Sequence, residues 1–159
     1  YFADNKELTK QNFVKIDLEK NLRINDNEYD TVILFNVLEH IFEYKNLLNE
    51  IFRILKKGGK LEIFVPFMYM YHKDPNDIMR PTHEYLTTLL SQAGFKTNVF
   101  LIGAGPFSVI SEILLKYAKF KFIKVFLLVI FLTIDKVIKR FSKDYSRYYN
   151  GTHCTCTKE

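Results

Sequence analysis

The 159-residue chain has no tryptophan, and it is poor in the residues that make tight turns, with six glycines and four prolines. An all-β fold built on many tight turns is therefore disfavoured. Hydrophobic residues make up 48% of the chain and charged residues 26%. This balance is typical of a folded globular protein and excludes a disordered or collagen-like chain. Because the length fits one domain of ordinary size, we expect residues 1–159 to form a single domain.

Cysteine is also scarce, since Cys154 and Cys156 are the only two and lie one residue apart. This spacing is geometrically poor for a disulfide. Together with the neighbouring His153, the pair supplies too few ligands for a structural metal site. We therefore expect two reduced thiols in a cytoplasmic protein, and no bound metal.

Positive charge is concentrated towards one end of the chain. Residues 1–115 carry 13 Lys and Arg against 15 Asp and Glu, whereas residues 116–159 carry 10 against 3. A nucleic-acid-binding protein would spread its positive charge differently, so nucleic acid is not the expected partner. Residues 106–143 have helical periodicity, with lysines set among apolar side chains, and predict a helical insertion. Its least charged stretch, residues 125–134, is shorter than the roughly 20 residues that span a bilayer.

Strand and helix signals alternate along the rest of the chain. The apolar run at 31–35 is typical of a strand buried on both faces. The expected elements are a strand at 13–16, a strand at 31–35, a helix at 43–55, a strand at 60–66, a helix at 82–93, a strand at 95–102, the helical insertion at 106–143 and a strand near 148–157. Thr82 is the expected N-cap of the second helix, and Lys56 to Gly59 the expected end of the first. This order predicts an α/β fold with a mostly parallel sheet, in which ligands bind at the carboxyl ends of the strands.

Two segments carry the most specific pattern in the sequence. Asp30 opens the strand at 31–35, which runs into the sequence Asn-Val-Leu-Glu-His at 36–40, and Arg-Ile-Leu-Lys-Lys-Gly-Gly at 53–59 precedes the next strand. Together they resemble the class I methyltransferases that use S-adenosylmethionine, of the methyltransferase type 11 kind, with Lys57 where that family often has proline. The resemblance implies a Rossmann-like sheet and S-adenosylmethionine as the cofactor.

The resemblance also implies which residues hold the cofactor. Asp4 matches the residue that binds the ribose hydroxyls, a task that suits a carboxylate because it accepts two hydrogen bonds. Asp17 matches the residue that accepts from the adenine amino group, and Leu18 packs against the ring. Asn36 and Val37 match the backbone that lines the methionine end. The alternative for each aspartate is a turn or cap residue.

The loop after the strand at 60–66 contains His72, then Pro-Asn-Asp at 75–77 and Arg-Pro-Thr at 80–82. In this pattern it is similar to the loop of methyltransferases in glycan and cell-envelope biosynthesis. The resemblance suggests His72 as the general base, Asp77 as its orienting partner, and Arg80 as the cation that holds an anionic acceptor such as a sugar phosphate. We expect O-methylation of a sugar hydroxyl, with N- and C-methylation left open. In the alternative interpretation, these three residues cap helices and fix a loop. Glu39 and His40 have an alternative of the same kind, in which they simply begin a helix.

One motif of the family has no counterpart, namely a strand followed by a glycine-rich turn. The first glycine is Gly58, far downstream of that position. We therefore expect the chain to be the C-terminal part of a longer methyltransferase domain. The alternative is a degenerate, non-catalytic binding module at a membrane surface.

Residues 106–143 are expected to contact a membrane. A helix with an apolar face flanked by cations lies in the interface of an anionic bilayer. Peripheral binding to the inner face of the membrane would suit a lipid-linked glycan acceptor, as the family resemblance implies. A cap docked on the sheet and a dimer contact are the alternatives, and the oligomeric state is left open.

Overall fold

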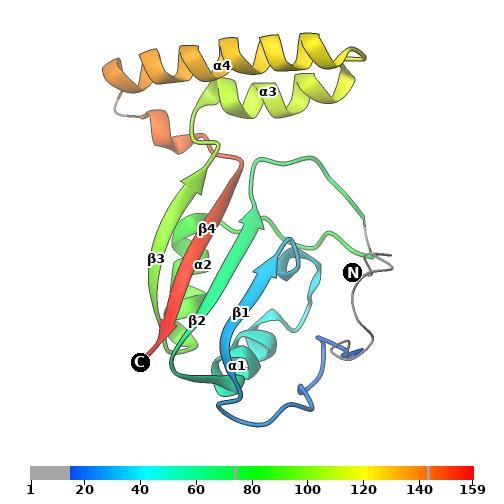
Figure 1. Cartoon of the computed structure of the whole chain (residues 1–159), viewed down its shortest axis with the longest axis vertical. Helices are drawn as coiled ribbons and strands as arrows, with labels where there is room; N and C mark the ends of the chain where they lie inside the picture. The colour runs from blue at the N-terminus through cyan, green and yellow to red at the C-terminus, as the bar shows by residue number, and fades with distance from the viewer. Residues whose placement is uncertain (1–14, 74, 143) are drawn as a thin grey trace.

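The computed structural model describes residues 15–73, 75–142 and 144–159. It has the α/β fold that the sequence predicts, built on a four-stranded sheet (Figure 1). The elements are β1 (Tyr29–Phe35), the 3-10 helix η1 (Leu38–His40), α1 (Tyr44–Ile54), β2 (Leu55–Pro66), α2 (His83–Gln92), β3 (Phe95–Ile102), α3 (Pro106–Tyr117), α4 (Lys121–Phe141), the 3-10 helix η2 (Tyr145–Arg147) and β4 (Gly151–Lys158).

The strands lie in the order β1-β2-β4-β3. β1 and β2 are parallel, as expected for two strands joined through a helix, whereas β4 runs antiparallel to both β2 and β3. Gly151 pairs with Ile102, so the chain enters β4 at the end of the sheet where β3 has just finished. It must therefore run back in the opposite direction, between β2 and β3.

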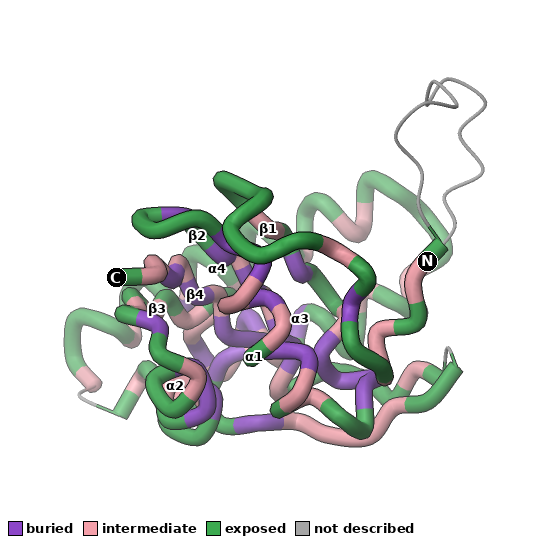
Figure 2. The backbone as a smooth tube through the Cα atoms, turned by 90° about the horizontal axis from the view of Figure 1, so that it is seen from below, coloured by how far each residue is buried: buried purple, intermediate pink, exposed green. Residues whose placement is uncertain are grey.

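Helices α1 and α2 cover one face of the sheet. The apolar spacing of α1 places Leu47, Leu48 and Ile51 on this face, and all three are buried against the strands. Figure 2 shows the buried stretches gathered at the centre of the molecule, around α1 and the strands. The opposite face carries Ile33 and Phe100, which are more than half exposed in the described structure.

Thr82 caps α2 as predicted, because its Oγ1 accepts the backbone N–H of Tyr85 at 3.3 Å. The predicted cap at Lys56 to Gly59 is wrong. Helix α1 ends at Ile54, and Leu55 is already extended and paired with β1. The pairing of Leu55 favours the strand, so the two lysines lie in β2 rather than in the last turn of the helix.

Two further expectations are corrected at the start of the chain and at η1. Residues 13 and 14 of the expected strand at 13–16 lie outside the described residues, and Lys15 and Ile16 are not in a strand. Glu39 and His40 do not begin the long helix, which starts at Tyr44. They form a separate buried 3-10 turn, and this turn places both side chains at the site described below.

The helical insertion predicted at 106–143 is present in the described residues as two packed helices, α3 and α4, in place of one. The pair lies beyond the carboxyl ends of β1 and β2, away from α1 and α2 (Figure 1). Buried Asp135 in α4 joins the two, since its carboxylate accepts the backbone N–H groups of Phe107 and Ser108 at the start of α3, at 3.1 and 2.6 Å. In the described part of the chain, no helix combines the length and apolar character needed to cross a membrane.

Candidate active site

A cavity of about 760 Å³ lies at the carboxyl ends of β1 and β2. The two strands end side by side, since Phe35 pairs with Phe64 in the parallel register. Helix α3 and the segment before β4 complete the wall. This is the place where an open α/β sheet binds its ligand. The polar residues that line the cavity are Asn36, His40, His72, Glu112, Lys116 and Asn150.

The chain leaves β1 through a sharp turn at Asn36. Its backbone has a φ of 52°, a left-handed conformation that asparagine tolerates better than most residues. Its N–H donates to the carbonyl oxygen of Phe64 at 3.1 Å, which ties the turn to β2. Asn36 and Val37 therefore line the cavity. This location is compatible with the cofactor-binding role expected for both residues.

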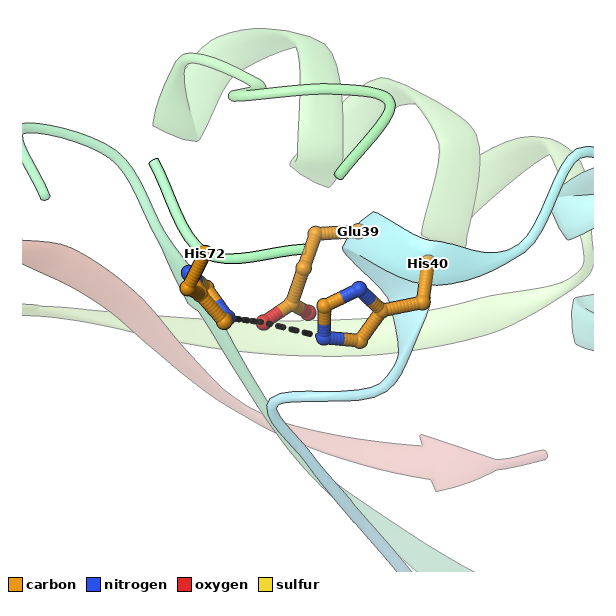
Figure 3. A group of neighbouring side chains, drawn as sticks. All are labelled: Glu39, His40 and His72. Carbon is orange, nitrogen blue, oxygen red and sulfur yellow. Dashed lines mark ion pairs between the residues drawn. The ribbon is translucent and has the colours of Figure 1, made fainter. Parts of the chain in front are cut away.

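Glu39 follows this turn and is completely buried. One of its carboxylate oxygens lies 3.7 Å from Nε2 of His40 and 3.7 Å from Nε2 of His72 (Figure 3). Neither oxygen has a hydrogen-bond partner among the described residues. Burial raises the pKa of Glu39, because ionisation leaves a charge with little solvation. The carboxylate is therefore held between two imidazoles without a hydrogen bond to either.

The three residues predicted for catalysis lie together in the loop after β2. Asp77 accepts the backbone N–H of His72 at 3.0 Å, and the guanidinium of Arg80 donates to both of its carboxylate oxygens. Burial opposes the ionisation of Asp77, but the hydrogen bonds from Arg80 and His72 hold its pKa below the usual range. Arg80 also donates to the carbonyl oxygen of Met70 at 3.3 Å. The guanidinium of Arg80 is thus engaged mainly with groups of its own loop.

The expected adenosine-binding residues lie elsewhere. Asp17 is exposed, accepts the backbone N–H of Glu19 at 3.1 Å and forms an ion pair with Lys20 at 3.0 Å. The hydrogen bond from Lys20 lowers the pKa of Asp17. Leu18 packs against the core, and Asp4 lies outside the described residues. Asp17 lines a separate hollow of about 320 Å³ and does not line the cavity at the strand ends.

Sequence reasoning missed three residues at this site. Glu39 and His40 belong to the motif that carries the family resemblance, but the sequence indicated no site role for them and left open that they simply begin a helix. Asn150 precedes β4 and lines the cavity, and its Oδ1 is buried without a hydrogen-bond partner in the described structure. No signal in the sequence pointed to Asn150, because only the return of β4 beside β2 brings it to the cavity.

Comparison with known proteins finds similarity to methyltransferases. The methyltransferase-domain family matches residues 2–63. A probable S-adenosylmethionine-dependent methyltransferase of Mycolicibacterium smegmatis is 30% identical over 83 residues, which cover 48% of this chain and 32% of that protein. The matched part thus spans about a third of the length of this relative.

Solved structures extend the similarity to nearly the whole chain. A methyltransferase from Archaeoglobus fulgidus that depends on S-adenosylmethionine matches with a TM-score of 0.57 and 20% identity, covering 92% of this chain and 66% of that one. The fold is that of the class I methyltransferases. The (4+2) cyclase SpnF also has it, with a TM-score of 0.57, 19% identity and coverage of 92% and 55%. The fold alone therefore does not determine the reaction.

S-adenosylmethionine is the cofactor of this type of domain, as the sequence predicted. The cavity fits such a ligand, since its volume of about 760 Å³ is within the range of small-molecule sites. The buried Oδ1 of Asn150 is an acceptor without a partner in the described structure. S-adenosylmethionine carries ammonium, amino and hydroxyl groups that can donate to such an oxygen.

Proposed function

We propose that the protein transfers a methyl group from S-adenosylmethionine to a small-molecule acceptor. The observation that carries this proposal is the cavity at the carboxyl ends of β1 and β2, which is lined by Asn36, Val37 and His72 together. The bound cofactor supplies an electrophilic methyl group on a sulfonium. Asn36, Val37 and Asn150 would hold its amino-acid end, and we propose that the adenosine end extends out of this cavity to Leu18 and to Asp17, which lines the separate hollow.

The acceptor proposed is a hydroxyl group, in particular that of a sugar. His72 lines the cavity, with its side chain 25% exposed, and its imidazole suits a general base near neutral pH. Asp77 fixes the loop through the backbone N–H of His72 and through Arg80. Because Arg80 is engaged by Asp77, we assign the recognition of an anionic acceptor to Lys116 as well, which reaches the same cavity from α3.

The test is a methyl-transfer assay with radiolabelled S-adenosylmethionine, the full-length protein and a panel of sugars and sugar phosphates. His72→Ala should lower turnover by about 10²–10⁴-fold and leave cofactor affinity almost unchanged. Asp17→Ala should instead raise the apparent cofactor constant. His83→Ala is the matched control, because His83 begins α2 and does not line the cavity.

Equal effects of His72→Ala and His83→Ala would contradict the assignment of the base. Cofactor binding without transfer to any acceptor of the panel would instead favour the non-catalytic binding module.

We further propose that the α3–α4 pair docks on the inner face of an anionic membrane, where a lipid-linked glycan would be presented. Phe122, Phe126 and Phe141 are 72%, 65% and 83% exposed, so α4 carries a large apolar surface. A lipid surface is favoured over a protein partner by the cations that flank these residues, each worth about 1 kcal/mol near anionic lipid. These cations are Lys116, Lys119, Lys121, Lys124, Lys136, Lys139 and Arg140.

Flotation with vesicles tests this proposal. The full-length protein should float with vesicles that contain phosphatidylserine, and binding should weaken with added salt. Replacing Phe122 and Phe126 by serine should abolish flotation. Phe42→Ser is the matched control, since Phe42 is 63% exposed but lies between η1 and α1. Flotation that survives the double replacement, or a stable dimer that buries α4, would overturn the proposal.

A further inference from the structure

We propose that Glu39, His40 and His72 bind a divalent transition-metal ion. This assignment goes beyond methyl transfer and does not depend on it. One carboxylate oxygen and one ring nitrogen from each histidine lie within 4.8 Å of one another. They come from two chain segments, η1 after β1 and the loop after β2, which the parallel strands bring together (Figure 3).

The distances are close to those that a metal requires. Metal–nitrogen and metal–oxygen bonds of about 2.0–2.2 Å place neighbouring ligand atoms about 3–3.5 Å apart. Both Nε2 atoms lie 3.7 Å from Oε1 of Glu39. The two ring nitrogens are within 4.8 Å of each other, so the rings must also close by about 1 Å to form a shared coordination sphere.

The hydrogen bonds of His40 direct the correct nitrogen towards Glu39. Its Nδ1 lies at hydrogen-bond distance from the backbone carbonyl oxygen of Asn76, which can only accept. The ring must therefore carry a proton on Nδ1, so in the neutral ring Nε2 presents its lone pair to the carboxylate. A backbone carbonyl bound to the far nitrogen is also the usual support of a metal-ligating histidine.

His72 has the same arrangement. Its Nδ1 lies 3.2 Å from the carbonyl oxygen of Met70 and 3.3 Å from Nη2 of Arg80. The two protons of this Nη2 are already directed to Asp77 and to Met70. With Nδ1 of His72 as the donor to Met70, the neutral ring also presents the lone pair of its Nε2 to Glu39.

With Glu39 ionised and both rings neutral, three electron-pair donors converge on one point. Glu39 is completely buried, and both of its oxygens lack a hydrogen-bond partner in the described structure. Burial of an ionised carboxylate is unfavourable unless a cation compensates its charge. A divalent ion between Glu39 and the two rings satisfies all three groups at once.

The chemistry of the ligands selects the kind of metal. Two imidazoles and one carboxylate suit Zn²⁺, Mn²⁺, Fe²⁺ or Co²⁺, whereas Mg²⁺ and Ca²⁺ prefer oxygen ligands alone. Three protein ligands leave coordination positions open. Because His40 and His72 both line the cavity, these positions face the proposed acceptor.

One consequence rests on the proposed methyl transfer. A hydroxyl bound to the ion would lose its proton more easily, because a divalent cation lowers the pKa of a bound oxygen ligand. The ion would then activate the acceptor, and His72 would act as a ligand in place of a general base.

The test measures metal binding alone, with neither cofactor nor acceptor present. The full-length protein, freed of metal by a chelator, is titrated with Co²⁺ by visible absorption and with Zn²⁺ against a chromogenic chelator. One ion per chain is expected to bind. Glu39→Gln and His72→Ala should each weaken binding by about 100-fold or more. His153→Ala is the matched control, since His153 contacts the carboxylate of Glu62 at 2.9 Å elsewhere on the sheet.

Circular dichroism confirms that each variant folds, and His72→Ala serves if Glu39→Gln does not, because His72 lies in a partly exposed loop. The absence of one-to-one binding, or equal affinity in wild type and both variants, would overturn the metal site. Either result would leave methyl transfer and the role of His72 as a base unaffected. Loss of binding in His153→Ala alone would overturn the site as well.

Discussion

His40 and His72 face each other edge to face, with ring centroids 5.1 Å apart and an interplanar angle of 89°. They follow neighbouring parallel strands and are brought together only by the pairing of β1 with β2. Tyr69 adds a third ring, edge to face with His72 at 5.7 Å. The motif after β1 and the loop after β2, which carry separate parts of the family pattern, therefore form one site.

Glu39→Gln should raise the free energy of unfolding by about 1–3 kcal/mol in the presence of a chelator. The variant removes a buried charge, and its amide can donate to the imidazole lone pairs. Burial raises the pKa of Glu39, so its stabilising protonated form is lost as pH rises through that pKa. The advantage of the variant should therefore grow with pH in urea unfolding. With Zn²⁺ present, wild type should be the more stable protein, and a wild type that stays less stable would contradict the metal site.

Asp77→Asn should lower the free energy of unfolding by about 3 kcal/mol, since it breaks a buried pair and leaves Arg80 without its partner. The pKa of Asp77 is lower in the folded protein than its ordinary value of 3.8. Asp77 therefore contributes fully to the free energy of unfolding above pH 3.8, and this contribution is lost as pH falls through the pKa of the folded protein. Urea unfolding at several pH values should show the two proteins converging in acid. Asp26→Asn is the control, because Asp26 is 67% exposed in its pair with Arg53 and should cost less than about 1 kcal/mol.

Cys154 and Cys156 should resist alkylation by iodoacetamide at pH 8 in the folded protein. Both thiols are free and buried in the sheet, and burial raises the pKa of Cys154 to about 12 and that of Cys156 to about 11. The thiolate, which is the reactive form, is therefore scarce. Mass spectrometry should find both sites unmodified until urea unfolds the chain. Because the pKa of each thiol is higher in the folded protein than its ordinary value of 9.0, the free energy of unfolding should fall only as pH rises above 9.0 towards the raised values. Rapid modification of either thiol in native protein would contradict their placement in β4.

Asp135→Ala should loosen the start of α3, because it removes the hydrogen bonds to Phe107 and Ser108. A lost helix cap costs about 0.5–2 kcal/mol, so the amides of α3 should exchange hydrogen several-fold faster. Gly105→Ala should have a similar effect, since an added Cβ would collide with the carboxylate of Asp135. Asp144→Ala should change nothing, as its side chain is 62% exposed. Unchanged exchange in both of the first two variants would show that the cap does not hold the pair together.

The fold could be predicted from local patterns because each of those patterns has one physical cause. The apolar spacing of α1 and the Thr82 cap of α2 are contained in short segments, and both predictions are confirmed. The order of helix and strand then leaves few ways to build the sheet. The expected strand at 13–16 and the cap at Lys56 to Gly59 were less secure, since each depends on strand pairing that no short segment determines.

The candidate site could be predicted only in part. His72, Asp77 and Arg80 lie within nine residues of one another, so a single loop brings them together. Glu39 and His72 are separated by 33 positions, and their approach depends on strand register and on the burial of η1. The glycan acceptor and the membrane contact stay predictions, because a side chain at a cavity or surface does not name its ligand.

The cavity is shared between two parts of the chain that are separable in sequence. The strand ends supply Asn36, His40 and His72, whereas Glu112 and Lys116 come from the helical pair, which is entered after β3 and left before β4. Replacing the residues of this pair would therefore alter which acceptor is admitted without touching the groups that act on it. For the proposed reaction, we therefore expect selectivity to be open to redesign, or to divergence in evolution, independently of the chemistry.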